Sequence, residues 1–185
     1  MNDRYIFRYI IILVMIVSVL LSGAAMLLKP YQDNNKKNEQ RINILKAAGI
    51  TGVDKKNAEQ LFMQHCTATH EGDLPYYIID DKTTVIPMHG NGLWGPIWGY
   101  IGIASDGKTV VGAVFDHKSE TPGLGAEITT DNFQSQFSGK EMQKSGDNIT
   151  VEVDAIAGAT RTSDGVKDMI KNTLEAYKAY FESHE

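Results

Sequence analysis

The segment from Tyr9 to Leu28 constrains the fold of this chain more than any other feature, because it contains no charged residue. It matches the roughly 20 apolar residues that a helix needs to cross a bilayer. A helix of that length inside a soluble domain would not be apolar on every side. The segment therefore predicts a membrane-spanning helix.

A cleaved signal peptide is the alternative, since Ser22 to Ala25 form a run of small residues. A signal core usually holds about 7–15 apolar residues, however, and this run is longer. No cysteine follows it closely enough for a lipid anchor. We expect an anchor that is retained.

The span divides the chain into four parts. Residues 1–8 form an amino-terminal segment, residues 9–28 the span, residues 29–41 a polar juxtamembrane connector or helix start, and residues 42–185 the main domain. Basic residues occur on both sides of the span, so the distribution of charge does not decide its orientation.

Composition excludes several classes of partner and site. The chain has 185 residues and a formal net charge of −5, so nucleic acid is not an expected partner. Its single cysteine, Cys66, rules out an internal disulfide and a multi-cysteine metal site. His65, Cys66 and His70 have the wrong number and spacing for structural zinc, and we interpret them as a half-buried helix end.

Alternating polarity and turn residues predict mostly antiparallel strands in the main domain. Two short helices are expected after Arg41, interrupted at Gly49 and Gly52, with Asp54 capping the second. The further expected elements are a hairpin over 74–85 that turns at Asp80–Asp81, paired strands at 100–104 and 109–115, a short helix at 131–137, and a polar hairpin over 139–148.

Two glycine-rich stretches follow the first hairpin. Residues 88–100 combine four glycines with Trp94 and Trp98, which suits either rings packed over bare backbone in a core or a wall for a flat aromatic ligand. Residues 117–128 contain Pro122 and Gly123, which favour the centre of a type II turn. We interpret His117 near Glu120 as stabilising this turn.

Residues 150–166 predict the end of a strand, a turn at Gly158 and Ala159, and then an amphipathic helix with Thr162 or Ser163 as its N-cap. The first N–H groups of a helix, next to hydroxyl side chains, are a suitable place for a phosphate. This pattern alone is weak, since most such joints are plain connections.

The letters of this stretch are more specific. Asp154 to Thr160 resembles the flavinylation motif of the FMN-binding domain family, in which a flavin transferase joins the FMN phosphate to the threonine hydroxyl. Glu120 to Gly125 and this motif occur in the same order in the single-span FMN-binding subunit of the sodium-translocating NADH:quinone oxidoreductase and in its counterpart in the Rnf electron-transport complex. The stretch from Gly92 to Tyr100 resembles the sodium-translocating version more.

This resemblance implies an α+β fold, in which a mainly antiparallel sheet flanked by helices follows a single amino-terminal transmembrane helix. It places the domain on the outer, periplasmic side of the bacterial inner membrane. Thr160 would carry FMN as a phosphoester, and Asp154 would be read by the flavin transferase. The implied contacts of the cofactor are Gly158, Ala159 and Thr162 around the phosphate, Glu120, Thr121, Gly123 and Leu124 along the isoalloxazine ring, and Trp94 as a shield on one side.

The resemblance also implies a function, which is to relay electrons between other membrane subunits of a sodium-pumping complex. No nicotinamide-binding motif, in which a Gly-x-Gly-x-x-Gly lies between a strand and a helix, is found in the sequence, so NADH is expected to be oxidised elsewhere. Two alternatives remain. One is an Rnf-type subunit or other extracytoplasmic flavoprotein. The other is a scaffold whose threonine is not modified, which Ala157 favours because the family usually has Ser or Thr there.

Overall fold

The computed structural model describes residues 3–70, 72–145 and 148–182, which fall into two units, residues 1–39 and 40–185. Helix α1 (Asp3–Ala47) is continuous for 45 residues and contains Pro30. The predicted connector over 29–41 is therefore helical. Strong helix formers such as Lys, Glu, Gln and Arg fill much of the sequence after Pro30, which favours continuation of the helix.

The apolar part of α1 meets the length and composition of a membrane-spanning helix. Its best 18-residue window has a mean hydropathy of 2.8, and none of that window is buried against the rest of the protein. This length and this composition are typical of a helix that crosses a bilayer.

A five-stranded antiparallel sheet forms the centre of residues 40–185. Its strands follow the order of the chain, so each strand pairs with the next. They are β1 (Cys66–His70), β2 (Tyr76–Ile79), β3 (Thr83–Asn91), β4 (Pro96–Ala104) and β5 (Val110–His117). A separate pair consists of β6 (Gln143–Ser145) and β7 (Asn148–Thr150), and the turn of this predicted hairpin, at 146–147, lies outside the described residues.

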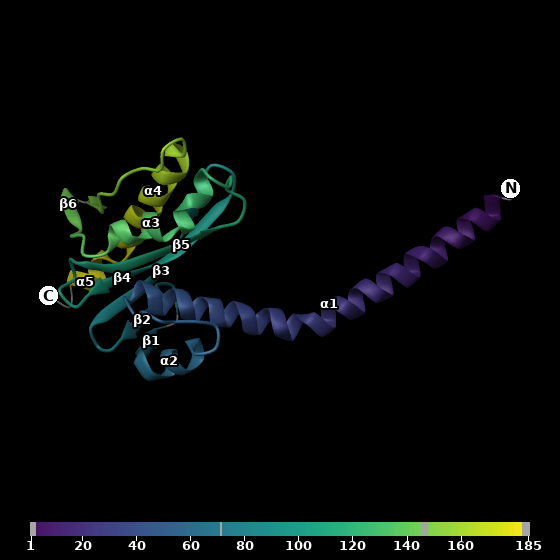
Figure 1. Cartoon of the computed structure of the whole chain (residues 1–185), viewed down its shortest axis with the longest axis horizontal. Helices are drawn as coiled ribbons and strands as arrows, with labels where there is room; N and C mark the ends of the chain where they lie inside the picture. Colours follow the sequence, from purple (N-terminus) through teal and green to yellow (C-terminus); the bar gives the residue numbers. More distant parts are fainter. Residues whose placement is uncertain (1–2, 71, 146–147, 183–185) are drawn as a thin grey trace. The chain divides into compact units, whose positions relative to one another are not determined.

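Helices cover both faces of the five-stranded sheet (Figure 1). The remaining elements are α2 (Ala58–His65), η1 (Gly125–Thr129), α3 (Asp131–Gln134), η2 (Ser135–Phe137), α4 (Thr160–Ala176) and α5 (Lys178–Glu182). The larger core lies between the sheet and α4, and includes Ile101, Phe115, Val166 and Ile170. The α+β class with a mainly antiparallel sheet is confirmed.

The smaller core lies on the opposite face, where the last turns of α1 pack on the sheet through Ile44 and Ala47. Gly102 and Gly112 allow this approach, since a Cβ at Gly112 would lie 3.0 Å from the Ala47 carbonyl oxygen and one at Gly102 would lie closer still. The end of α1 is therefore part of the globular domain.

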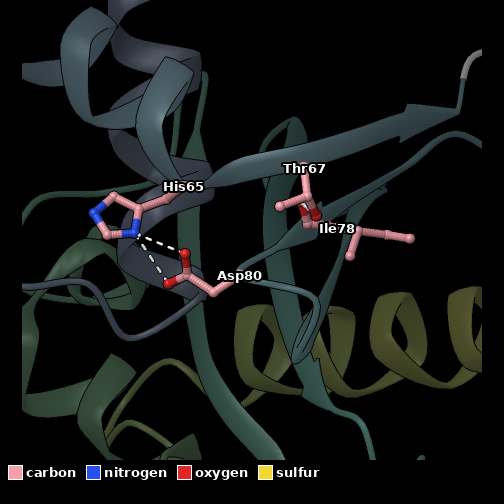
Figure 2. Close-up of polar contacts among 4 residues, drawn as sticks. All are labelled: His65, Thr67, Ile78 and Asp80. Carbon is pink, nitrogen blue, oxygen red and sulfur yellow. Dashed lines mark hydrogen bonds and ion pairs between the residues drawn. The ribbon is translucent and has the colours of Figure 1, made fainter.

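The prediction of a helix end at residues 65–70 was partly wrong. His65 does end α2, but Cys66 to His70 form strand β1, which pairs with β2. Figure 2 shows the junction, where Nδ1 of His65 contacts both carboxylate oxygens of Asp80 at 2.9 and 3.0 Å, and the Thr67 hydroxyl donates to the Ile78 carbonyl at 3.3 Å. Pairing with β2 determines that Cys66 to His70 form a strand. The sequence of these five residues alone does not determine it.

Other local predictions agree with the structure. The prediction of Asp54 as the cap of α2 is wrong, however, because the N-cap residue is Asn57, and the Asp54 carboxylate instead accepts from the N–H groups of Lys56 and Asn57 in the preceding turn. The Asp80–Asp81 turn joins β2 and β3, and both of its residues have positive φ, at 52° and 54°. Strand β3 continues beyond the predicted hairpin to Asn91, because its whole length pairs with β4.

Candidate functional site

A tight turn precedes α4. The N–H of Ala159 donates to the Ile156 carbonyl at 3.0 Å, and Gly158 has φ +75°. This is the third residue of the turn, where a type II turn needs positive φ, so glycine is the suitable residue there. The Leu124 side chain lies over the turn, since a Cβ at Gly158 would be 3.1 Å from Leu124 Cδ2. The 120–125 loop and the 154–160 motif are therefore neighbours in space.

The predicted N-cap at Thr162 or Ser163 is wrong, because α4 begins earlier, at Thr160. Its N-cap residue is Ala159, which makes no side-chain capping bond. The Ser163 hydroxyl instead donates to the Ala159 carbonyl at 3.1 Å and accepts from the Ile156 N–H at 3.0 Å. Ser163 thus fastens the turn to the helix, and no side-chain cap occupies the donors of the first turn of α4.

Thr160 is exposed at the first position of α4, and Asp154 and Ala157 of the same motif are exposed too. The Asp154 N–H donates to Oε1 of Gln136 at 2.8 Å, which holds this loop in place. A cavity of about 460 Å³ lies beside the motif, and its lining includes Asp154 to Ala157, Gln136 and Glu127. Thr160 is therefore accessible from solvent.

The loop after β5 forms the predicted type II turn. The Leu124 N–H donates to the Thr121 carbonyl at 3.1 Å, and Gly123 between them has φ +74°. Nδ1 of His117 accepts from the Glu120 N–H at 3.1 Å, so His117 stabilises the start of the loop. The side chain of Glu120 then points inward, away from solvent.

Glu120 is a buried carboxylate, 4% exposed, that receives hydrogen bonds from two separate parts of the chain. Its Oε1 accepts from the Trp94 N–H at 2.8 Å, and its Oε2 accepts from the Thr162 hydroxyl at 2.7 Å. Burial by itself raises the pKa of Glu120. The hydrogen bonds from Thr162 and from the N–H groups of residues 93–95 outweigh burial, and the pKa lies below its ordinary value.

Glycines make room for this carboxylate on two sides. A Cβ at Gly92 would lie 2.5 Å from Glu120 Oε1, and a Cβ at Gly125 would lie 2.5 Å from Glu120 Oε2 and 2.6 Å from the Thr162 hydroxyl oxygen. All three distances are far below van der Waals contact. Gly92 and Gly125 therefore allow the backbone of both glycine-rich stretches to lie close to the Glu120 carboxylate.

The tip between β3 and β4 presents apolar side chains to solvent. Trp94 is 66% exposed, and it is neither buried nor part of a core, so the core interpretation is wrong for this residue. In the described part of residues 40–185, the exposed large apolar side chains are Met63, Leu74, Leu93, Trp94 and Leu124. Of these five, Leu93 and Trp94 belong to the tip, and Leu124 belongs to the loop that lies over Gly158.

The structure thus brings the predicted site residues into one region, although not all at its surface. Thr160, Thr121, Gly123, Leu124, Gly158 and Trp94 are exposed, whereas Glu120, Thr162 and Ala159 are buried. Leu93 was not predicted as a site residue, and Ser163 was predicted only as an N-cap. The position of Leu93 between Gly92 and Trp94 is a usable signal, but the bonds of Ser163 depend on where α4 begins.

Comparisons with known proteins support a single family. The FMN-binding domain family matches residues 92–175, which contain the tip, the 120–125 loop and Thr160. The NqrC subunit of the Na(+)-translocating NADH-quinone reductase from Haemophilus ducreyi is 29% identical over 220 residues, covering 88% of this chain and 86% of that protein. The NqrC subunit of Neisseria meningitidis serogroup B is 28% identical, with coverage of 83% and 82%.

Solved structures agree. The crystal structure of the NqrC subunit from Parabacteroides distasonis superposes with a TM-score of 0.71 and 31% identity, covering 83% of this chain and 96% of that one. NqrC of Shewanella oneidensis gives a TM-score of 0.68 at 20% identity, covering 81% of this chain and 98% of that one, and supports the fold alone. The chain belongs to the FMN-binding domain family, among the homologues of the NqrC subunit of the Na(+)-translocating NADH-quinone reductase.

Proposed function

We propose that this chain is a membrane-anchored flavoprotein subunit that carries FMN as a phosphoester on Thr160 and relays electrons inside a sodium-translocating NADH:quinone reductase. The observation that carries the proposal is the exposed Thr160 at the start of α4, beside the exposed Leu93, Trp94 and Leu124. One region thus offers an acceptor hydroxyl and an apolar surface.

The start of α4 fits the phosphate of FMN. Ala159 provides no capping oxygen, so the N–H groups of the first turn are suitable donors for an anion held on Thr160. The dipole of the 17-residue helix also favours negative charge at this end. Thr162 would contribute its N–H, since its hydroxyl is engaged by Glu120.

The exposed apolar side chains fit the isoalloxazine ring. Leu124 lies against the Gly158 turn, which places an apolar surface next to the attachment point. A flat aromatic ring would cover Leu124 and stack on or beside Trp94, and removing this surface from water would stabilise the bound form. Bound FMN would supply the electron-transfer chemistry, and the chain would supply attachment and orientation.

Attachment requires an activated flavin donor, because a hydroxyl can displace only a leaving group from phosphorus. A flavin dinucleotide has such a group in its pyrophosphate. The bond from Thr160 Oγ1 to phosphorus forms, the phosphoanhydride bond to the leaving nucleotide breaks, and the threonine proton is released. A flavin transferase would catalyse this step and recognise Asp154, whose exposed side chain lies six residues before Thr160.

Flavin fluorescence in a denaturing gel tests the attachment. The full chain is expressed with an active flavin transferase, next to Thr160→Ala and the matched control Thr129→Ala, which removes another exposed threonine. Fluorescence should be present in the wild type and in Thr129→Ala and absent in Thr160→Ala. A wild-type band without fluorescence would reject covalent attachment. It would favour the scaffold alternative, which is supported by Ala157 at a position where the family usually has Ser or Thr.

The membrane part of the proposal assigns residues 1–8 to the cytoplasm, 9–28 to the bilayer of the inner membrane, and 42–185 to the outer side, in contact with other membrane subunits. The apolar, unburied part of α1 supports the span. Cys66 is the only cysteine and is partly exposed, so it can report the orientation. A membrane-impermeant maleimide should label Cys66 before the cells are lysed.

A matched control carries Cys66→Ser together with Asn2→Cys, and it should be labelled only after lysis. The reverse pattern would place the domain in the cytoplasm. Co-purification separates the complexes, since an NqrC-type protein copurifies with the rest of a sodium-translocating reductase, an Rnf-type protein with the rest of an Rnf complex, and a free-standing flavoprotein with neither. The relatives reported above are all NqrC proteins, which favours the first.

A further inference from the structure

The carboxylate of Glu120 accepts a hydrogen bond on each of its oxygens from within the chain. Oε1 accepts from the Trp94 N–H at 2.8 Å, and the neighbouring N–H groups of Leu93 and Gly95 also help to lower the pKa of Glu120. Oε2 receives the Thr162 hydroxyl. Successive backbone N–H groups that converge in this way form a concave anion-binding site, and here a side chain of the same protein fills it.

The two groups of donors come from different elements that carry different parts of the proposed site. The Leu93–Gly95 tip joins β3 to β4 and carries the exposed Trp94, while Thr162 lies in the first turn of α4, two residues after Thr160. Gly165 lets α4 lie directly on the end of β3, since a Cβ there would collide with the Asn91 carbonyl oxygen. Glu120 links the tip to the helix at this contact.

Both oxygens accept a hydrogen bond from within the chain, and the side chain is 4% exposed, so little of the carboxylate is open to a ligand. We infer that Glu120 is a positioning residue, whose carboxylate holds the tip with Trp94 against the first turn of α4 with Thr160 before any flavin is attached. The consequence for flavin attachment rests on the function proposed above, whereas the link itself is a property of the protein without flavin.

The mobility of Trp94 in the flavin-free protein tests the link. The full chain, made without a flavin transferase and kept in detergent, carries Trp98→Phe so that Trp94 is the only tryptophan. Glu120→Gln keeps the shape but replaces one acceptor oxygen by an NH2 group that faces donors. The fast local component of the Trp94 anisotropy decay should roughly double in amplitude, since the charged hydrogen bond that holds the tip is lost.

Controls separate positioning from general stability. Glu175→Gln, on the last turns of α4, removes a carboxylate that lies 4.0 Å from Lys171 and should leave the decay unchanged. Thr162→Val should increase the mobility of Trp94, and Thr173→Val, which loses a hydroxyl bonded within the same helix, should not. All decays are compared at a temperature where circular dichroism shows each variant folded.

Flavin attachment gives a second readout. With an active transferase, the initial rate of attachment to Glu120→Gln should fall about tenfold relative to wild type, as expected for a misplaced first turn of α4. A Trp94 decay in Glu120→Gln and Thr162→Val that equals the decay of their controls would overturn the inference. A dark wild-type band would instead reject the proposed function, and the anisotropy of the flavin-free protein would still decide the link.

Discussion

The hydroxyl of Thr162 donates to the Glu120 carboxylate across 42 positions of sequence, at 2.7 Å and with both residues buried. This bond joins the loop after β5 to the first turn of α4. It explains why two stretches that are remote in the sequence, residues 120–125 and 154–160, form one structural unit.

Gly125→Ala should destabilise the protein by about 1–3 kcal/mol, as expected when extra volume is forced into a packed site. The added Cβ would lie 2.5 Å from Glu120 Oε2. In a Glu120→Ala background that oxygen is gone, so the same substitution should cost less. A double-mutant cycle by urea unfolding in detergent measures the difference. Equal costs in both backgrounds would show that Gly125 is not required by Glu120.

Acid should weaken the contribution of Glu120 to stability. Its folded pKa lies below the unfolded value of about 4.3, so its contribution is complete above that value and is lost as the pH falls through the folded pKa. Wild type should exceed Glu120→Gln in unfolding free energy by about 1.5–3 kcal/mol at pH 7. The gap should narrow below pH 4. Hydrogen bonds from backbone N–H groups lower the pKa of Asp54, and a bond from the Thr109 hydroxyl, followed by backbone N–H groups, lowers the pKa of Asp106. These carboxylates also make stability depend on acid, so the contribution of Glu120 is obtained only as the difference between wild type and Glu120→Gln.

Alkali should weaken the contribution of Tyr177. Burial, and secondarily the nearby Tyr77, raise the pKa of Tyr177 to about 12. The unfolded chain loses its tyrosine protons near pH 10, so this contribution is complete below pH 10 and is lost as the pH rises towards 12. Tyr177→Phe removes a 2.6 Å hydrogen bond to the Pro75 carbonyl.

Tyr177→Phe should therefore lower the unfolding free energy by about 1 kcal/mol at neutral pH and make its decline between pH 10 and 12 less steep. Burial also raises the pKa of Tyr100 to about 12, so part of the decline should persist. Tyr31→Phe, at a position 74% exposed, serves as the control and should change neither quantity. An unchanged alkaline slope in Tyr177→Phe would contradict this account.

The Asp80–Asp81 turn offers two substitutions with different expected outcomes. Both residues have positive φ, which glycine adopts at lower cost, so Asp81→Gly should raise stability by about 0.5 kcal/mol. Asp80→Gly gains the same relief but loses the contact with His65 shown in Figure 2. An exposed pair of this kind contributes about 0–1 kcal/mol, so Asp80→Gly should be the less stable variant. In a His65→Gln background the two substitutions should become equal.

Local sequence signals predicted the elements that are determined locally. Glycines that have positive φ in the structure, Pro122 and the Asp80–Asp81 pair predicted turns correctly. The helical spacing of apolar residues from Val166 onward predicted α4. Strand β1 was missed because its five residues follow α2 without a break and acquire their conformation from pairing with β2. Continuation of α1 through Pro30 was not predicted either, since the helix formers that follow it prevail over the missing hydrogen bond.

The site shows the same limit. The sequence indicated which residues belong together, but not which of them are buried. In the sequence alone, Gly92 and Gly125 suggest space for a ligand. In the structure, the Glu120 side chain fills that space. The hydrogen bond between Thr162 and Glu120 joins residues 42 positions apart, so no local sequence pattern predicts it. The N-cap of α4 could also be identified only from the structure.

The intact mass of the protein purified from its own membranes is the most direct test of the central claim. The account predicts a mass that exceeds the sequence by one FMN less one water, with the addition located by fragmentation on Thr160. Thr160→Ser should retain the addition, since a hydroxyl remains, and Thr160→Ala should lose it. An unmodified mass, or an addition on any other residue, would contradict the account.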